Sequence, residues 1–338
     1  MSHLYKCLNL FSKVRSRRFK LFGILVLHLL KRRYVGIFID PTLACNFRCL
    51  MCYFSDEEKR SSLHGSLSAE DIEHIAKAFF HRALKLQIGC GAEPTTSKHL
   101  VHLISKGKEY GVPYISITTN GGLLNSDILE SYVCAGLDEL TLSCHGVKKE
   151  TYEYFMPGGK YEHFVTLLND VASLKQKYPS LKVRINYTMN EDNVEELKEL
   201  SHLLAKTSVD ILQVRPIRKI GKSAYLNFSV DRIVAFYNNV LEPLKEYCGS
   251  HGIICIMPTI ENLYDLHEKI HPEDQYIKEL LYCYISPQSC WREDFDTLRD
   301  SFDSYCKRHG RITNIIKHIF NSSYASAHDE VTPKKVVS

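Results

Sequence analysis

The segment Gly36-Ile-Phe-Ile-Asp40-Pro-Thr-Leu-Ala-Cys45-Asn-Phe-Arg-Cys49-Leu-Met-Cys52 joins a short apolar run to three cysteines that fall within eight residues. A loop this short can turn three thiols toward one compact metal centre, and thiolates suit iron–sulfur clusters and zinc. Three thiolates on a four-iron cube leave one iron open to a further ligand, as a catalytic zinc keeps an open position. The spacing therefore predicts a cluster at Cys45, Cys49 and Cys52, with two alternatives left open. These are a zinc site completed by a distant His or Cys, and plain buried cysteines.

Strand-like and helix-like patterns alternate along the chain from Tyr34 onward. The expected strands cover residues 36–40, 84–88, 114–119, 139–143, 182–189 and 210–216. Between them, a helix begins at the capping residue Ser68, another ends at Gly136, and a third covers residues 191–206. Such alternation produces right-handed βαβ units and a parallel sheet.

The number of these units predicts the architecture. Six units over residues 34–222 average about 31 residues each, as in a closed eightfold barrel of about 250 residues. We therefore expect an α/β fold with an open partial TIM barrel, (β/α)6, and a doubly wound sheet is the alternative. Residues 1–33 would form a basic, helical extension, and residues 223–338 a smaller cap over the open side of the barrel. In either fold the site lies beyond the carboxyl ends of the strands.

The composition is that of a globular protein. Of 338 residues, 44% are hydrophobic and 24% are charged, which excludes a disordered, collagen-like or membrane-spanning chain as the main interpretation. Twelve cysteines are too few for a small disulfide scaffold. No small-residue cleavage site follows the apolar run near the start, so we expect the reducing cytoplasm.

The net charge of +4 hides a strong asymmetry. Residues 1–33 contain nine Lys or Arg and no Asp or Glu, so the remainder carries a net charge of −5. A nucleic-acid partner is therefore not expected. The apolar run at 21–30 is too short to cross a bilayer, which needs about 20 residues. We expect a helix that packs on the domain, and the alternative is a peripheral membrane contact through residues 17–33.

Polar motifs follow the second, third and fourth expected strands. They are Gly91-Ala92-Glu93-Pro94, Asn120 beside Gly121, and Ser143. Each has an ordinary structural alternative, since Gly, Pro and Asn also make simple turns. Their shared place at strand ends favours a binding site. Polar residues inside the apolar strands face either the cavity or the outer helices: Arg184, Asn186, Gln213 and Arg215.

Taken together, the cysteine triad and these motifs resemble the radical S-adenosylmethionine (SAM) superfamily over residues 34–222. The resemblance implies that the triad binds one 4Fe–4S cluster. It implies that the Gly91–Pro94 motif, similar to the family's Gly-Gly-Glu-Pro, binds the SAM amino group through Glu93. Asn120 closes the third strand as is common in the family, and Ser143 matches a polar residue that contacts the ribose or the methionine end of SAM.

Three residues depart from the family pattern, and one of them, Met156, stands where related sequences often have Arg, so any contact made by that Arg is lost here. Met51 stands where an aromatic residue usually packs near adenine, and a polarizable thioether can fill the same apolar role. Ala92 replaces a glycine, a small change that need not obstruct a backbone contact.

The resemblance also implies the chemistry. One electron from the reduced cluster cleaves SAM to methionine and a 5′-deoxyadenosyl radical, which abstracts hydrogen from a substrate. A flavodoxin or ferredoxin would supply the electron. The stretch 157–161 resembles the branch that includes peptide-modifying enzymes and molybdenum-cofactor synthases, so a peptide substrate is favoured over a small molecule. The alternatives are a non-catalytic zinc- or iron–sulfur-binding protein and an accessory protein with a degenerate site.

The carboxyl-terminal cysteines do not predict a second cluster. Cys283, Cys290 and Cys306 are widely spaced, and four thiolates are needed for ligation by protein alone. Cys248 and Cys255 lie in apolar stretches, which disfavour thiolates. We expect one cluster per chain.

Overall fold

The computed structural model describes residues 14, 16–217, 223–225, 229–264 and 272–320. A single nine-stranded sheet curves through the molecule in the order β7-β6-β5-β4-β3-β2-β1-β8-β9. All neighbouring strands are parallel except β8 and β9. The strands are β1 (Val35–Ile39), β2 (Ala83–Ile88), β3 (Ile115–Thr119), β4 (Glu139–Cys144), β5 (Lys182–Met189), β6 (Ile211–Pro216), β7 (Ile254–Ile256), β8 (Tyr282–Ser286) and β9 (Ser289–Cys290).

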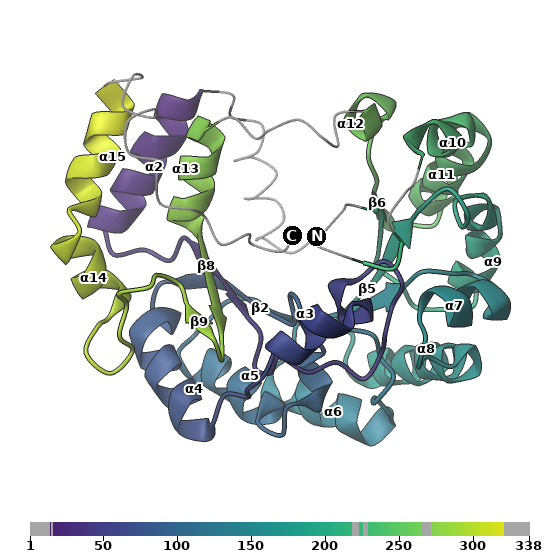
Figure 1. Cartoon of the computed structure of the whole chain (residues 1–338), viewed down its shortest axis with the longest axis horizontal. Helices are drawn as coiled ribbons and strands as arrows, with labels where there is room; N and C mark the ends of the chain where they lie inside the picture. Colours follow the sequence, from purple (N-terminus) through teal and green to yellow (C-terminus); the bar gives the residue numbers. More distant parts are fainter. Residues whose placement is uncertain (1–13, 15, 218–222, 226–228, 265–271, 321–338) are drawn as a thin grey trace.

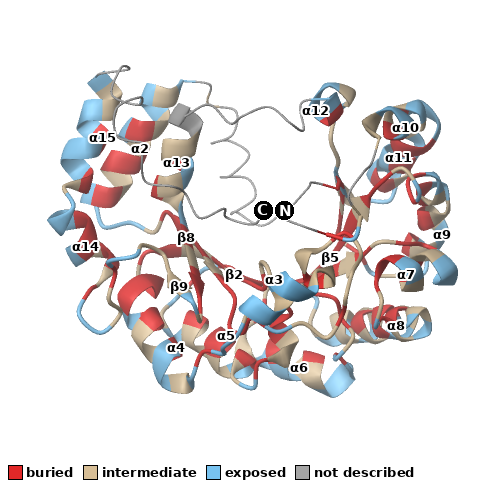
Figure 2. Ribbon diagram, in the orientation of Figure 1, coloured by how far each residue is buried: buried red, intermediate tan, exposed pale blue. Residues whose placement is uncertain are grey.

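Helices cover the convex side of this sheet, and the sheet does not close on itself (Figure 1). The α-helices are α2 (Arg17–Leu29), α3 (Glu57–Ser62), α4 (Ala69–Ile75), α5 (Leu100–Glu109), α6 (Ser126–Ala135), α7 (Lys149–Phe155), α8 (Tyr161–Lys177), α9 (Leu200–Leu204), α10 (Val230–Ala235), α11 (Glu242–Ser250), α12 (Ile260–Tyr264), α13 (Pro272–Leu281), α14 (Phe302–Arg308) and α15 (Arg311–Phe320). Buried residues concentrate where the strands meet these helices (Figure 2). The open partial barrel expected from the sequence is confirmed.

The six strands predicted from alternation are all present, with ends that differ by at most one residue. The local helix signals are confirmed as well. Ser68 and Asp71 form a reciprocal capping box at the start of α4. Gly136 ends α6 in the left-handed conformation, with φ of 110°, which a glycine adopts without strain.

The helix expected over residues 191–206 is much shorter than predicted. The chain forms a 3₁₀ turn over Glu195–Glu199 and then the single-turn helix α9. Asn190 explains the late start, because its Oδ1 accepts hydrogen bonds from the backbone of Asp192 at 2.8 Å and of Asn193 at 3.0 Å. Such a side-chain turn competes with helical hydrogen bonding.

The region after residue 222 contributes more to the sheet than the sequence predicts. Strand β7 pairs with β6 at one edge, and β8 pairs with β1 at the other edge. Residues 253–257 have the apolar pattern of a short strand, and β7 forms there, whereas β8 and β9 were not predicted. The division into residues 1–33, 34–222 and 223–338 stays a prediction, but the third region shares the sheet of the second.

Helix α2 packs on the body of the protein as expected. Its buried face consists of Leu21, Ile24, Leu25 and His28. The buried Arg82 secures its end, because the guanidinium donates to the His28 carbonyl at 3.0 Å and to the Arg32 carbonyl at 2.9 Å. The same guanidinium pairs with Asp303 of α14 at 2.7 Å. No helix in the described part of the chain is long and apolar enough to cross a membrane.

Replacing this guanidinium should loosen α2 and α14 together. Arg82→Met keeps much of the volume but removes the donor to two carbonyls and one of the two side chains that pair with Asp303, so we expect a loss of about 2–4 kcal/mol in the free energy of unfolding. Urea unfolding of the full chain measures it. The control Arg299→Met removes an arginine that is 87% exposed and should change stability by less than about 0.5 kcal/mol. Equal stabilities of the two variants would contradict this role of Arg82.

Candidate active site

The three cysteines lie in the loop that follows β1, at the carboxyl ends of the strands. Backbone hydrogen bonds shape this loop: Cys52 N–H donates to the Cys49 carbonyl at 2.9 Å, and Arg48 N–H donates to the Pro157 carbonyl at 2.8 Å. The Arg48 guanidinium also donates to the Cys45 carbonyl at 2.7 Å. The loop is therefore closed on itself and tied to the segment after α7.

The thiols of Cys45, Cys49 and Cys52 lie in one short loop and are largely shielded from water. Burial raises the pKa of Cys45 to about 12 and also raises the pKa values of Cys49 and Cys52. The charges that Cys45 and Cys52 would carry as thiolates raise the pKa of Cys49 further. Within the described part of the chain, no three His, Cys, Asp or Glu side chains converge as a metal site. The loop nevertheless carries three soft, buried sulfur donors within eight residues, and donors of this kind fit a thiophilic centre whose positive charge favours the thiolates.

A buried carboxylate next to the cysteine loop organises the turn after β2. Asp40 directly follows β1 and is fully buried. It accepts hydrogen bonds from the backbone N–H groups of Cys90 at 2.7 Å and Gly91 at 3.1 Å, and from the Tyr284 hydroxyl at 2.7 Å. Burial raises the pKa of Asp40, and these hydrogen bonds oppose that shift by favouring the carboxylate.

The turn at Gly91 also touches the residue after the third cysteine. The Tyr53 hydroxyl donates to the Gly91 carbonyl. A Cβ on Gly91 would lie 2.5 Å from that hydroxyl oxygen, so this close approach requires glycine. The motif after β2 and the cysteine loop therefore form one unit.

Glu93 is held inside this unit and is only 3% exposed. One carboxylate oxygen accepts from the hydroxyls of Thr95 and Thr119, each at 2.7 Å, and the other accepts from Asn120 N–H at 2.7 Å. Burial raises the pKa of Glu93, whereas these hydrogen bonds lower it. Glu93 thus locks the end of β3 to the turn after β2, and a carboxylate keeps further lone pairs for an ammonium group.

Asn120 connects the third strand to the cysteine loop. Its amide Nδ2 donates to Asn46 Oδ1 at 2.8 Å and lies 3.9 Å from Cys45 Sγ. The structure therefore brings the cysteine loop, the Glu93 turn and Asn120 together, as the sequence motifs predict.

Met51 and Ser143 lie on the side of the site toward β4 and β5. Met51 is 8% exposed, packs against Phe155 and Ile217, and accepts a hydrogen bond on Sδ from Asn190 Nδ2 at 3.1 Å. Ser143 is partly buried near the end of β4, opposite Asn186 of β5.

Asn186 is 5% exposed, and its Oδ1 has no hydrogen-bond partner within the described residues. A buried acceptor without a partner costs free energy unless a ligand or water supplies a donor. It lies beside Ser143, where the sequence motifs predict SAM, so this observation fits a bound polar molecule.

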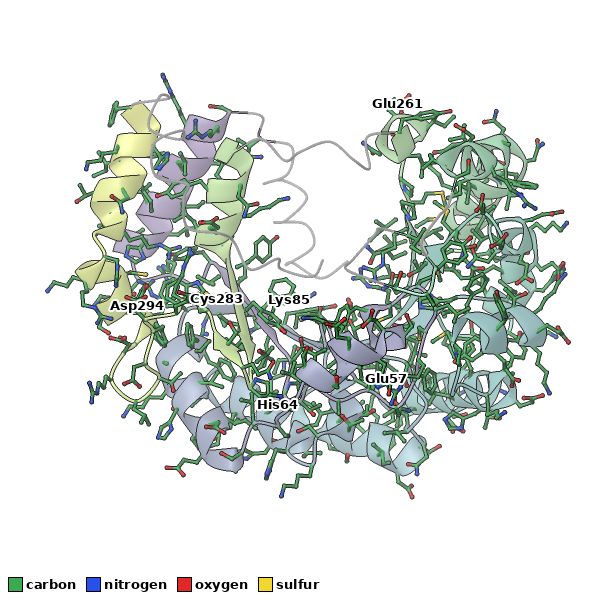
Figure 3. The ribbon with its side chains drawn as sticks, in the orientation of Figure 1. Glu57, His64, Lys85, Glu261, Cys283 and Asp294 are labelled. Atoms are coloured by element: carbon green, nitrogen blue, oxygen red, sulfur yellow. The ribbon has the colours of Figure 1, made fainter. Side chains whose placement is uncertain are left out.

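A polar network fills the inner side of the sheet below these residues. Glu139 of β4 is 1% exposed, accepts from the Tyr114 hydroxyl at 2.6 Å and pairs with Arg184 at 3.0 Å. Arg184 also donates to Gln213 Oε1 at 2.9 Å. Lys85 of β2 lies inside the curve of the sheet as well (Figure 3). Arg184 and Gln213 therefore belong to this inner network rather than to the outer face.

A neutral histidine follows β4. His145 Nδ1 bonds to the Cys144 carbonyl at 2.8 Å, which makes Nδ1 the protonated nitrogen. Burial, aided by Arg215, lowers the pKa of His145 to about 4. The imidazole is therefore uncharged at neutral pH.

Several of these residues were missed from the sequence. Asp40 had a usable signal, because it is a carboxylate directly after an apolar strand. Tyr284 had none, because its strand was not predicted. Asn190 and His145 gave only the weak signal of a polar residue at a strand end.

Comparisons with known proteins agree with this geometry. Residues 39–204 match the family model for the radical SAM superfamily. Two relatives are each named "Probable GTP 3′,8-cyclase". The one from Saccharolobus solfataricus is 31% identical over 193 residues, which cover 55% of this chain and 59% of that protein. The one from Saccharolobus islandicus is 30% identical over 219 residues, which cover 63% of this chain and 67% of that protein. The match thus spans less than two thirds of the first relative.

A solved structure shares the fold. Streptococcus suis SuiB bound to S-adenosylmethionine aligns with a TM-score of 0.57 and 16% identity, covering 75% of this chain and 59% of SuiB. At this identity the likeness concerns the fold alone. Together with the family match over the cysteine loop and the strands β2 to β5, it leads to one conclusion: this chain is an enzyme of the radical SAM superfamily.

Proposed function

We propose that Cys45, Cys49 and Cys52 bind a single 4Fe–4S cluster and that the enzyme uses it to cleave SAM reductively and abstract hydrogen from a substrate. The observation that carries this proposal is the junction at Asn120, whose amide contacts the cysteine loop while its backbone N–H is held by Glu93. A reduced cluster, when bound, supplies the electron for cleavage. A flavodoxin or ferredoxin in the cytoplasm would be the donor.

The residues of this chain would bind and orient SAM. Glu93 offers lone pairs to the amino group from a carboxylate that the threonines already hold in place. Asn186 Oδ1 offers an unused acceptor beside Ser143, suited to a ribose hydroxyl. Met51 offers a thioether at an apolar wall for adenine.

The carboxyl-terminal cysteines support the count of one cluster. Cys283 and Cys306 are buried within the hydrophobic core of the protein. Arg311 donates to Cys306 Sγ at 3.4 Å, which gives that sulfur a role in the packing of α14 and α15. Structural thiols of this kind are inert.

The favoured substrate is a peptide, supported by the branch resemblance at residues 157–161. A solved neighbour, SuiB, has been captured with its precursor peptide and shares the fold. The second candidate is GTP, because the relatives of 30% and 31% identity are named for that substrate.

The cluster assignment predicts a specific iron count. Anaerobically reconstituted enzyme should hold about four iron and four sulfide per chain, and Cys45→Ala, Cys49→Ala or Cys52→Ala should each abolish them. Iron and sulfide analysis with visible absorption measures this. The matched control Cys134→Ala removes an exposed thiol on α6 and should leave about four iron. Zinc without sulfide would favour the binding-protein alternative, and about eight iron would contradict a single cluster.

The role of Glu93 predicts a loss of SAM affinity without loss of the cluster. Glu93→Gln keeps the size of the side chain but removes a charge-assisted contact of about 1.5–3 kcal/mol, so SAM should bind about 10- to 150-fold more weakly. Equilibrium dialysis on the cluster-loaded variant measures the affinity. Glu57→Gln, at a carboxylate whose side chain is 88% exposed, is the control. Unchanged affinity would remove Glu93 from the SAM site.

The hydrogen bonds that Asp40 accepts predict a second way to weaken SAM binding while the cluster is kept. Asp40→Asn weakens the acceptor that holds Cys90 and Gly91, so the turn carrying Glu93 should lose its position. We expect roughly tenfold weaker SAM binding with iron retained, since hydrogen bonds to charged groups contribute about 1.5–3 kcal/mol. Tyr284→Phe removes one donor and should show a smaller effect of the same kind. Full affinity in both variants would show that the turn does not depend on Asp40.

The two substrate candidates are distinguished by product analysis. Reduced enzyme with SAM should release 5′-deoxyadenosine slowly on its own. If GTP is the substrate, adding GTP should accelerate release and consume GTP in equal amount. If a peptide is the substrate, GTP should have no effect, and a peptide encoded next to the enzyme should accelerate release. No 5′-deoxyadenosine under any condition would contradict the whole proposal.

A further inference from the structure

Helix α2 presents an apolar stripe to solvent on the side opposite its packed face. The exposed fractions of its members are large: Phe19 65%, Phe22 54%, Leu29 56% and Leu30 63%. At 100° per residue these four positions fall within about 100° of the helix circumference, and the buried residues occupy the other side. The basic extension is therefore apolar on both faces, but only one face is covered by the protein.

The chain segment that carries this stripe is basic, whereas acidic residues lie on α13, which also packs against α2. Residues 1–33 contain no Asp or Glu, and Arg18, Lys31 and Arg32 are exposed next to the stripe. The adjacent helix α15, which packs against α2, also has no acidic residue and exposes Ile312, 38%, and Phe320, 79%. An apolar strip bordered by cations is the pattern of a helix that lies at a membrane interface.

An open pocket of about 670 Å³ begins where the stripe ends. It is lined by Leu27, Lys31, Arg32, Arg33 and His81. The Arg33 guanidinium donates to the Ala83 carbonyl at 3.2 Å, which places this pocket at the amino end of β2. The candidate active site lies at the opposite, carboxyl ends of the strands.

The pocket is cationic on balance. His81 pairs with Asp303 at 3.1 Å, but that carboxylate also pairs with the buried Arg82. Lys31 and Arg32 stand at its rim and are exposed. Its chemistry therefore suits a phosphate group.

We propose that α2 docks this enzyme on an anionic phospholipid membrane, with the stripe inserted at the boundary of headgroups and acyl chains and the pocket receiving a lipid phosphate. The charge pattern favours an anionic membrane over two other partners for the stripe, namely a second copy of this chain and residues 1–15 of the same chain. A second copy would oppose one basic border to another, and residues 1–15 carry further basic residues and no acidic ones. This inference does not depend on the substrate.

The test is co-sedimentation of the full chain with phosphatidylcholine vesicles that contain or lack phosphatidylglycerol. The enzyme should pellet with the anionic vesicles, bind the neutral ones much less, and dissociate largely at about 0.5 M salt, where screening is strong. Inorganic phosphate added at low millimolar concentration should compete only weakly, because the stripe also contributes.

Two double variants separate the apolar and the cationic contributions. Phe22→Ser/Leu30→Ser should weaken partitioning by roughly tenfold or more, since two apolar side chains no longer insert. Lys31→Glu/Arg32→Glu should weaken it by roughly 30-fold or more on anionic vesicles and leave binding to neutral vesicles unchanged. The matched controls are Leu298→Ser, 71% exposed elsewhere, and Lys160→Glu/Lys206→Glu.

Iron content and thermal unfolding must match the wild type, which shows that the variants fold. Equal vesicle binding by the wild type and both double variants would overturn the proposal, as would failure of the wild type to bind. Sedimentation velocity without lipid tests whether the stripe instead joins two copies of this chain. A dimer that dissociates in Phe22→Ser/Leu30→Ser would show that a second copy covers the stripe, and would also overturn it.

Discussion

The carboxylate of Asp40 is the point on which the arrangement of the site depends. Among the described residues no cation pairs with this buried carboxylate, which accepts hydrogen bonds from Cys90 and Gly91, which follow β2, and from Tyr284 on β8. A buried charge is tolerated only when its lone pairs are occupied. This requirement forces the turn after β2, the start of the cysteine loop and a strand from the far end of the chain into one place. The position of Glu93 depends on this arrangement, because Glu93 lies in the turn that Asp40 holds.

This constraint also explains why the sheet extends past six strands. Strand β8 runs parallel to β1, and that pairing places Tyr284 beside Asp40. A cap that only covered the barrel opening would not supply this hydroxyl. The carboxyl-terminal region therefore helps to build the site, while its Cys283 and Cys306 lie in the hydrophobic core.

The two ends of the sheet carry different chemistry. The carboxyl ends gather soft sulfur donors and a few satisfied polar groups, which suits a cofactor that must be shielded from water. The amino end near α2 gathers exposed cations beside apolar side chains. Arg82 lies at the amino end of the sheet, where it donates a hydrogen bond to the last turn of α2 and pairs with Asp303. A single chain can in this way separate catalysis from attachment.

Features that depend on neighbours along the chain could be predicted from the sequence. Strand and helix periodicity predicted six strands and the open barrel, and spacing alone brought three thiols into one loop. The placement of motifs at strand ends predicted that Glu93 and Asn120 would meet the cysteines. Three features emerge only in the folded chain: β8 joins β1, Tyr284 completes the hydrogen bonds of Asp40, and Asn186 presents an acceptor without a partner among the described residues. Parallel pairing and buried hydrogen bonds join residues that lie far apart in sequence, where no local pattern records the partner. The same holds for α2, because its periodicity shows two apolar faces and only packing decides which one the protein covers.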